Sequence, residues 1–265
     1  DTASIKTFCD ADTGGTPTIG TVRTWYDQSG NGHDATQSTA SAQPQIYNGS
    51  SVLTKNNSPA IQFDANDVLT YTGNFLGGSA ATGVSVSSFR LANATNRDIV
   101  YGAQDLSGAR YDFAVVRQSN DVIDFYVEGN FQSDSGSITD TAQHLLTAIY
   151  SNNTRRVIYD NGSVLKTLTN NALGNLDDAT DFLIGADISG PSNYFDGYMQ
   201  ELVIWNSDQE ADANRTGIES NISTYYFGQD LLLDIYPSSE AAYSVRKLSK
   251  YYQGPCMKVR KDDGV

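Results

Sequence analysis

The chain has 265 residues, a formal net charge of −14 and a charged fraction of only 18%. This acidity argues against nucleic acid or an anionic membrane surface as a partner, because both attract basic side chains. No run of apolar residues is long enough to span a bilayer. The length is compatible with one β-sandwich or barrel and suffices to bury a substantial core. Cys9 and Cys256 are too few for a disulfide scaffold, and they either pair with each other or remain unpaired.

Short alternating segments dominate the chain from residue 60 onward. They are rich in Val, Ile, Tyr and Phe, and they are separated by Gly, Asn, Asp and Ser, as is typical of β-strands. Asn161-Gly162 predicts a two-residue type I′ hairpin turn. Many short strands without alternating helices predict an all-β antiparallel sandwich or jelly roll. The predicted strands cover residues 60–64, 83–91, 97–103, 111–117, 122–129, 144–151, 155–168, 182–187 and 197–205.

A helical pattern follows the last of these strands. Residues 208–226 carry apolar side chains, Tyr225 among them, on one helical face. Asp208 is a candidate N-cap because its carboxylate can accept a hydrogen bond from an unpaired N–H group of the first turn. We therefore predict a short helix near the end of the sandwich.

The C-terminal segment, residues 229–265, differs in pattern from the rest of the chain. Residues 237–254 are predicted as a helix that stops at a Gly-Pro pair, and residues 256–261 are predicted as a strand. We place a boundary near Gly228. The sandwich domain then covers residues 1–228, and the C-terminal element is a helix–strand appendage.

Six motifs follow one another along the chain. They are DQSGNGHDATQ (27–37), PAIQFDANDVLTYT (59–72), VIYDNGSVLK (157–166), FLIGAD (182–187), FDGYMQELVIWN (195–206) and GIESNISTYY (217–226). Together they resemble the concanavalin A-like lectin/glucanase superfamily, in its laminin-G-like branch. The resemblance implies two apposed antiparallel sheets in jelly-roll topology.

A second set of motifs is DTASIKTFC (1–9), RTWYDQSGNGHDATQ (23–37), QPQIYNGSSVLTKNNSPAIQFD (43–64) and AAYSVRKLSKYYQGPCMKVRKDDG (241–264). These resemble modules of bacteriophage tail and virion proteins and, more distantly, the catalytic domain of arabinofuranosidase B. In those families the last of these motifs comes first. Either residues 229–265 open the next module of a tandem array, or they complete the sandwich of this chain or of a neighbouring copy. Their basic character, beside an acidic body, favours docking on a neighbour.

The arabinofuranosidase resemblance implies two catalytic carboxylates. YGAQD matches the stretch that ends in the nucleophile of that family, which implies Asp105, and IGADISG matches its acid/base, which implies Asp187. A retaining glycosidase needs such a pair. However, the family has Glu as the nucleophile and a vicinal cysteine pair upstream, where this chain has Asp98-Ile99. The competing interpretation is that both are turn residues at strand ends, because a fold alone does not carry a function.

Hard oxygen ligands gather in the glycine-rich loop DQSGNGHD. Asp27, Asn31 and Asp34 could bind Ca²⁺, which prefers carboxylate and amide oxygens. The competing interpretation is that these side chains cap the amides of their own turn. The alternative calcium ligands lie in FDAND and are Asp64, Asn66 and Asp67.

Rings and amides in loops are candidates for stacking on sugars and for hydrogen bonds to hydroxyl groups. The candidate glycan-binding residues are Tyr47, Tyr71, Asn193 and Tyr194.

We therefore predict a non-enzymatic adhesion or structural module of a phage virion or another extracellular assembly. Its expected partners are cell-surface glycan and other copies of itself or neighbouring structural proteins, and its expected location is extracellular or on a virion surface. One alternative is a retaining glycoside hydrolase of the arabinofuranosidase type, and another is a purely architectural repeat that links copies.

Overall fold

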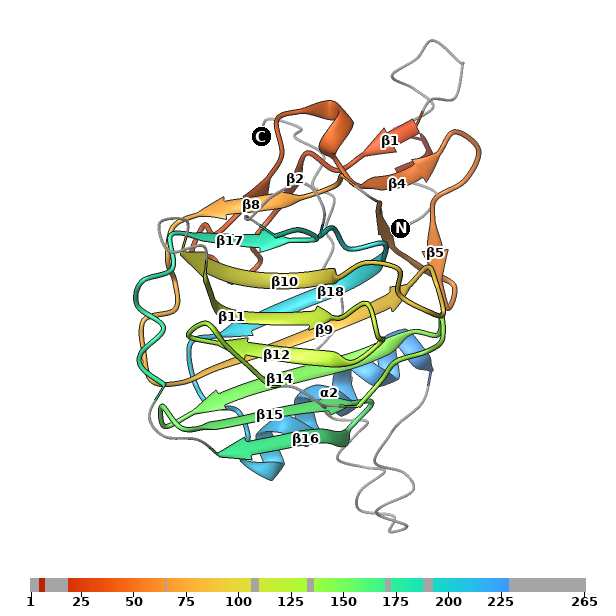
Figure 1. Cartoon of the computed structure of the whole chain (residues 1–265). Coiled ribbons are helices and arrows are strands. Elements are labelled where there is room, and N and C mark those ends of the chain that lie inside the picture. The colour runs from red at the N-terminus through yellow and green to blue at the C-terminus, as the bar shows by residue number, and fades with distance from the viewer. Residues whose placement is uncertain are drawn as a thin grey trace.

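Figure 1 shows the computed structural model of the chain. It describes residues 5–7, 19–64, 66–105, 110–132, 136–169, 173–187 and 193–228. The predicted C-terminal helix and strand and both cysteines lie outside these residues. The assignment of residues 229–265 therefore stays a prediction.

Most of the described strands form two stacked sheets (Figure 1). Sheet A has the order β1 (Ile19–Thr21), β4 (Gln45–Asn48), β7 (Ile61–Phe63), β18 (Gly197–Trp205), β9 (Ala81–Phe89), β14 (His144–Ser151), β15 (Arg155–Asp160) and β16 (Ser163–Thr169). Sheet B has the order β13 (Asn130–Gln132), β12 (Ile123–Val127), β11 (Arg110–Arg117), β10 (Asp98–Asp105), β17 (Asp181–Ile184), β8 (Leu69–Thr72), β3 (Ala35–Thr36) and β2 (Thr24–Trp25). The remaining elements are the 3₁₀ turn η1 (Ala40–Ala42), the hairpin strands β5 (Thr54–Lys55) and β6 (Ser58–Pro59), and the helix α2 (Asp212–Phe227).

The strands pair in antiparallel fashion throughout the described part of the chain. The order in sheet A does not follow the chain. The last strand, β18, lies between β7 and β9 and pairs with both. The predicted antiparallel jelly-roll sandwich is therefore confirmed.

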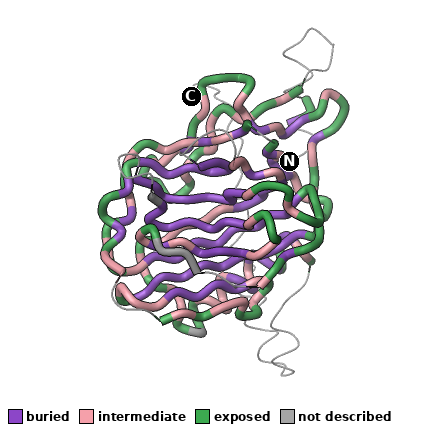
Figure 2. Tube along the Cα trace, in the orientation of Figure 1, coloured by how far each residue is buried: buried purple, intermediate pink, exposed green. Residues whose placement is uncertain are grey.

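Side chains of sheet B alternate between the core and the outer face. Phe113 and Val115 of β11 and Phe125 of β12 point between the sheets and are fully buried. Their neighbours Ala114 and Tyr126 belong to a separate cluster on the outer face. Figure 2 shows that burial concentrates in the strands and exposure in the connecting loops. Each fully buried apolar side chain stabilises the fold by about 1.5–3 kcal/mol relative to an exposed one.

The helix α2 packs on the outer face of sheet A (Figure 1). Its buried side chains contact apolar residues of two central strands, and the hydroxyl of Tyr226 donates a hydrogen bond to the Gln200 carbonyl oxygen at 3.2 Å. The helix ends at Gly228, which adopts the left-handed conformation at φ 64° that favours glycine. The apolar contact is formed by Val84, Val86, Leu145, Ile222 and Tyr226.

Two details of the predicted helix are corrected by the structure. The helix begins at Asp212, after Ala211, and no side chain caps it. Asp208 instead accepts a hydrogen bond from the Glu210 N–H group at 2.7 Å, within the preceding loop. Tyr225 is 48% exposed, and its neighbour Tyr226 is the buried ring.

The predicted hairpin turn at Asn161-Gly162 is confirmed. Both residues have positive φ, 50° and 78°, as a type I′ turn requires. The Asn161 side-chain oxygen also accepts a hydrogen bond from the Leu145 N–H group at 3.0 Å, which ties the hairpin to β14.

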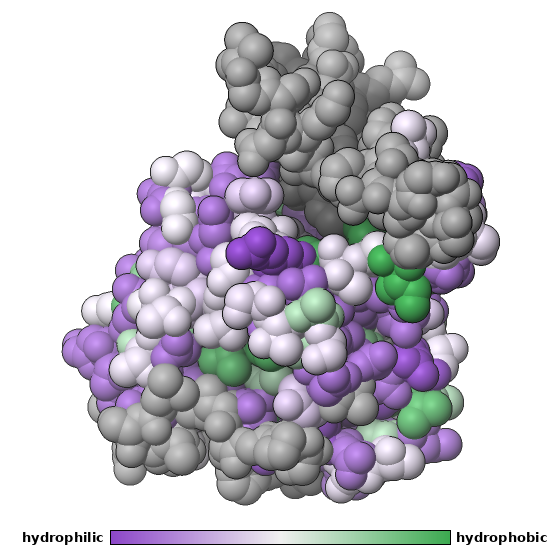
Figure 3. Space-filling view, turned by 90° about the horizontal axis from the view of Figure 1, so that it is seen from above, coloured by the Kyte–Doolittle hydropathy of each residue, from purple (hydrophilic) through white to green (hydrophobic). Residues whose placement is uncertain are grey.

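In the view from above, the surface that is not drawn in grey is mostly hydrophilic, with a few hydrophobic residues (Figure 3). None of the helices in the described part is long and apolar enough to cross a membrane. The large hydrophobic side chains that are exposed lie in different segments of the chain: Ile19, Tyr26, Leu91, Val164 and Tyr225.

Candidate functional site

Two tyrosines meet on the outer face of sheet B. Backbone pairing places Tyr126 opposite Ala114, and Ala114 opposite Gly102. The small side chains beside Tyr126 leave room for its ring, which packs against that of Tyr111 with centroids 4.9 Å apart. A Cβ atom on Gly102 would approach the Ala114 Cβ to 2.7 Å, so this close packing requires glycine.

Arg97 lies over both rings. Its Cζ atom is 5.8 Å from the Tyr111 ring centroid and 5.7 Å from that of Tyr126. Its Nη2 atom also donates a hydrogen bond to the Tyr126 hydroxyl at 3.2 Å. Cation–π contacts at partly exposed sites contribute about 0.5–1 kcal/mol, so the guanidinium and the two rings hold one another in place.

Asp187, in the loop after β17, also belongs to this group. Its Oδ2 atom accepts a hydrogen bond from Asn193 Nδ2 at 3.1 Å, and its N–H group donates to the Asn193 carbonyl oxygen at 3.2 Å. Burial raises the pKa of the Tyr111 hydroxyl, and the nearby Asp187 carboxylate raises that pKa further. Tyr111 therefore stays a neutral hydroxyl beside Asp187.

Gln118 and Asp124 extend the group on the other side. The Gln118 side-chain nitrogen donates to Asp124 Oδ2 at 2.6 Å and to the Tyr126 hydroxyl at 3.0 Å. A continuous set of contacts thus joins β11 and β12 to the loops beside them. We call it the tyrosine face, and its members are Arg97, Tyr111, Gln118, Asp124, Tyr126, Asp187 and Asn193.

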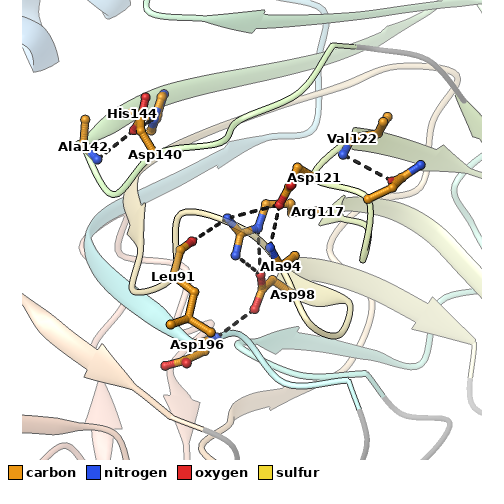
Figure 4. Close-up of polar contacts among 11 residues, drawn as sticks. Leu91, Ala94, Asp98, Arg117, Asp121, Val122, Asp140, Ala142, His144 and Asp196 are labelled. Atoms are coloured by element: carbon orange, nitrogen blue, oxygen red, sulfur yellow. Dashed lines mark hydrogen bonds and ion pairs between the residues drawn. The ribbon is translucent and has the colours of Figure 1, made fainter.

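A buried ion pair supports the loop between β9 and β10, which carries Arg97 (Figure 4). The Arg117 side chain is 1% exposed, and its Nη2 atom lies 2.6 Å from Asp98 Oδ2. Arg117 Nη1 donates to the Leu91 carbonyl oxygen at 2.9 Å, and Asp121 Oδ1 accepts from the Ala94 N–H group at 2.6 Å. These bonds fix the loop to β11 and to the turn that follows it.

Of the predicted catalytic carboxylates, Asp105 is the last residue of β10 and Asp187 lies in the loop after β17, and each is 8% exposed. The Gln104 side chain is on the outer face, where its Nε2 atom donates to the Ala186 carbonyl oxygen at 3.4 Å. Successive residues of a strand point to opposite faces, which directs Asp105 away from the tyrosine face. Only Asp187 belongs to that face, and a shared catalytic role stays a prediction.

The four predicted glycan-binding residues lie in different environments. Asn193 belongs to the tyrosine face, and its half-buried neighbour Tyr194 pairs with Ala186 in an isolated bridge. Tyr71 is half-buried in β8, and its ring contacts the His33 ring with centroids 4.9 Å apart. The expectation for Tyr47 is corrected, because this residue lies in β4 with a fully buried side chain and offers no ring to a ligand.

The loop with Asp27, Asn31 and Asp34 is held by hydrogen bonds within itself. The Asp27 carboxylate accepts from the Ser29 N–H and hydroxyl groups, both at 2.7 Å, and from the His33 N–H group at 3.1 Å. Asp34 Oδ1 accepts from the Asp27 N–H group at 2.8 Å. Burial alone would raise the pKa of Asp27, but the bonds from Ser29 and His33 lower it overall. Turn capping accounts for these contacts, and calcium binding in this loop stays a prediction.

The alternative calcium ligands also bond to backbone. Asp67 Oδ2 accepts from the Asp64 N–H group at 3.0 Å, and Asn66 Nδ2 donates to the Ser41 carbonyl oxygen at 2.5 Å. Burial, together with the charge of Asp64, raises the pKa of Asp67 to about 6. A calcium ion here also stays a prediction.

Three carboxylates from separate segments converge at one rim of sheet B. Each of Asp112, Glu128 and Asp178 offers an oxygen atom, and these oxygens lie within 4.8 Å of one another, close enough to hold a metal ion. Asp112 is fully buried, Glu128 has a positive φ of 52°, and Asp178 is exposed. No spacing motif marks these residues in the sequence, because only the fold brings them together.

The family of the chain is established by comparison. A family model described as the concanavalin A-like lectin/glucanases superfamily matches residues 79–212, which is half of the chain. The chain belongs to this superfamily. The match covers β9 to β18 and therefore includes every residue of the tyrosine face. It also confirms the resemblance drawn from the motifs. No curated protein matches the chain.

Several solved structures share the superfamily fold. An α-L-arabinofuranosidase of family GH54, soaked with 4-nitrophenyl α-L-arabinofuranoside, is 14% identical with a TM-score of 0.59, over 84% of this chain and 54% of that one. The binding domain of Paraclostridial Mosquitocidal Protein 1 is 13% identical with a TM-score of 0.55, over 79% and 52%. A Trypanosoma rangeli sialidase in complex with 2,3-difluoro-KDN is 14% identical with a TM-score of 0.52, over 77% and 32%. This chain thus spans only about a third to a half of those proteins, and the likeness establishes the fold alone.

Proposed function

We propose that this protein is a non-enzymatic carbohydrate-binding module and that it binds glycan through the tyrosine face. The observation that carries the proposal is the joint presence of two packed tyrosine rings, a guanidinium and two side-chain amides on the outer face of sheet B, which α2 does not cover. The sequence resemblance to virion modules supports a place on a virion surface or in another extracellular assembly.

The chemistry of the tyrosine face suits a sugar. Sugar hydroxyls both donate and accept hydrogen bonds, and the face offers donors on Arg97 and Asn193 beside acceptors on the Gln118 amide oxygen and on its carboxylates. Half-buried Tyr126 offers a ring on which the apolar face of a sugar can pack. Binding sites commonly combine aromatic walls with a few fixed polar groups. Two solved structures of the same fold, an arabinofuranosidase and a sialidase, were obtained with carbohydrate ligands, which supports the same ligand class here.

Binding without hydrolysis is favoured by the position of the carboxylates. Asp187 accepts a hydrogen bond from Asn193, and strand alternation directs Asp105 to the other face of β10. A retaining glycosidase requires both carboxylates on one ligand, about 5–5.5 Å apart. The glycoside hydrolase remains the second candidate, since Asp187 lies within the proposed binding face.

The binding proposal is tested on a glycan array, followed by calorimetric titration of the glycans that bind. Tyr126→Ala should weaken binding at least about tenfold, which corresponds to about 1.4 kcal/mol. Tyr225→Ala is the matched control, because Tyr225 is an exposed tyrosine on α2, on the opposite side of the sandwich. An array without any bound glycan would contradict the proposal and favour the architectural repeat.

Hydrolysis is tested separately with 4-nitrophenyl α-L-arabinofuranoside. We expect no release of nitrophenolate above the rate without protein. Release that disappears in both Asp105→Ala and Asp187→Ala would replace the binding proposal with the glycoside hydrolase.

A further inference from the structure

The tyrosine face has an excess of negative charge among the residues that compose it. Asp124 and Asp187 each contribute a carboxylate, and Arg97 is the single cation. Both carboxylates are nearly buried, at 4% and 8% exposure, so water and salt screen them less than they screen surface groups. The net charge of −14 on the whole chain adds to the negative electrostatic potential around this face.

The cation of the face is already engaged by neutral groups. The Arg97 guanidinium lies over the rings of Tyr111 and Tyr126 and donates to the Tyr126 hydroxyl. The charges of Asp124 and Asp187 both act on the Tyr126 hydroxyl to which Arg97 donates, so an anionic ligand at Arg97 would lie near both carboxylates. Two like charges so close together repel each other, and the low local dielectric strengthens the repulsion.

The remaining ligand-binding groups of the face are uncharged. The Asn193 amide nitrogen carries two donor hydrogens, one of which is bonded to Asp187. Gln118 donates both of its amide hydrogens within the face, to Asp124 and to Tyr126, and offers its amide oxygen as an acceptor. The hydroxyls of Tyr111 and Tyr126 remain protonated, because burial raises the pKa of both. Amides and hydroxyls bind sugar hydroxyls without requiring a charge on the ligand.

We infer that the tyrosine face selects uncharged glycans and discriminates against carboxylated or sulfated ones. This inference rests on the proposed carbohydrate-binding function and names the ligand class of the same site. Asp124 and Asp187 are then the residues that set the specificity, through repulsion of the wrong ligand as well as bonds to the right one.

The test compares matched glycans on one array, each neutral oligosaccharide beside its sialylated and its sulfated form. We expect each neutral form to bind at least about tenfold more tightly than its charged forms. The affinity for the neutral form should also stay constant between about 0.05 M and about 0.5 M NaCl, because no ligand charge is screened. Tighter binding of the charged forms, or an affinity that falls with salt, would overturn the inference and leave carbohydrate binding standing. Absence of binding to any glycan would overturn both.

Two variants test whether Asp124 and Asp187 cause the preference for neutral glycans. Asp124→Asn and Asp187→Asn each remove one charge at nearly constant volume and should narrow the ratio of neutral to sialylated affinity about three- to tenfold. Asp208→Asn is the control, since Asp208 is an exposed carboxylate in the loop before α2 and its replacement makes the same change in net charge. An unchanged ratio in both folded variants would show that these carboxylates do not set the specificity. Should either variant fail to fold, the salt dependence of the wild type still decides the question.

Discussion

The two outer faces of the sandwich differ in what they present. The outer face of sheet A is apolar at its centre, where Val84, Val86 and Leu145 pack under α2. The outer face of sheet B carries charged groups, amides and rings that bond to one another across strands. The stabilising contacts under the helix and the polar groups proposed for recognition thus lie on opposite faces of one fold. A change under the helix should unfold the protein without altering its specificity, and a change on the tyrosine face should do the reverse.

The largest effect is expected under the helix. Leu145→Ala leaves a cavity between β14 and α2 and should lower the free energy of unfolding by about 3 kcal/mol. Urea denaturation measures this loss, and glycan titration of the folded variant should give the affinity of the wild type. Val164→Ala is the control, because Val164 is 56% exposed on β16 and should change stability by less than about 0.5 kcal/mol. A folded Leu145→Ala protein that binds glycan more weakly would break the separation of the two faces.

A smaller effect is expected at the end of sheet B, in the loop between β2 and β3. Asp27→Ala removes an acceptor that three donors share and should cost about 1–2 kcal/mol. Thermal melts in EDTA and in calcium should show the same loss if the carboxylate serves only to cap the turn. A loss confined to the calcium buffer would instead establish the cation site.

The same loop predicts that the stability of the fold depends on pH in the acidic range. Because the folded-state pKa of Asp27 lies below its ordinary value of 3.8, the Asp27 carboxylate contributes fully to the free energy of unfolding above that pH. The contribution is lost as the pH falls through the lowered pKa. The difference in melting temperature between wild type and Asp27→Asn should therefore shrink below about pH 3.8.

The smallest effect is expected from His144, a polar group at the start of β14 in sheet A. Its Nδ1 atom lies 2.9 Å from Asp160 and its Nε2 atom 3.0 Å from Asp140 (Figure 4 shows the second pair). Burial lowers the pKa of His144, but the two carboxylates outweigh burial and raise it above 6.5. The protonated His144 ring therefore stabilises the folded state fully below about pH 6.5, and this stabilisation is lost as the pH rises through the raised pKa.

Melting temperatures between pH 6 and pH 9 should show this decline in the wild type but not in His144→Gln. An NMR titration of the imidazole gives the pKa directly. A value below 6.5 would contradict the assignment of a protonated ring between two carboxylates. Glycan binding at the distant tyrosine face should not follow the same titration.

The sandwich could be predicted because its signals are local. Alternating apolar residues marked the central strands, and Asn161-Gly162 marked its hairpin with two residues that tolerate positive φ. The start of α2 was predicted too early because Asp208 resembles an N-cap, although it caps only the turn at Glu210. Tyr47 was misjudged because β4 is a short strand with little alternation to reveal it.

The candidate site could be predicted only in part. Asp187 and Asn193 were found by resemblance and by their loop position, whereas the aromatic pair was missed. Simple alternation places Tyr111 on the same face as buried Phe113. The register shift between β10 and β11 pairs Ala103 with Phe113 and Gln104 with Tyr111, so one extra residue turns Tyr111 outward. Such a bulge follows from strand pairing, which the local sequence does not encode.

The position of β18 has a consequence for how the chain folds. Residues 197–205 form β18, which must pair with both β7 at 61–63 and β9 at 81–89. The middle of sheet A therefore stays incomplete until nearly the whole domain has left the ribosome. Pairing across so many residues incurs loop-closure entropy before it gains contact energy, and such topologies fold slowly. Until β18 arrives, the facing edges of β7 and β9 are open to strands of other chains. The interval before closure is therefore the stage at which this protein is most vulnerable to misassembly.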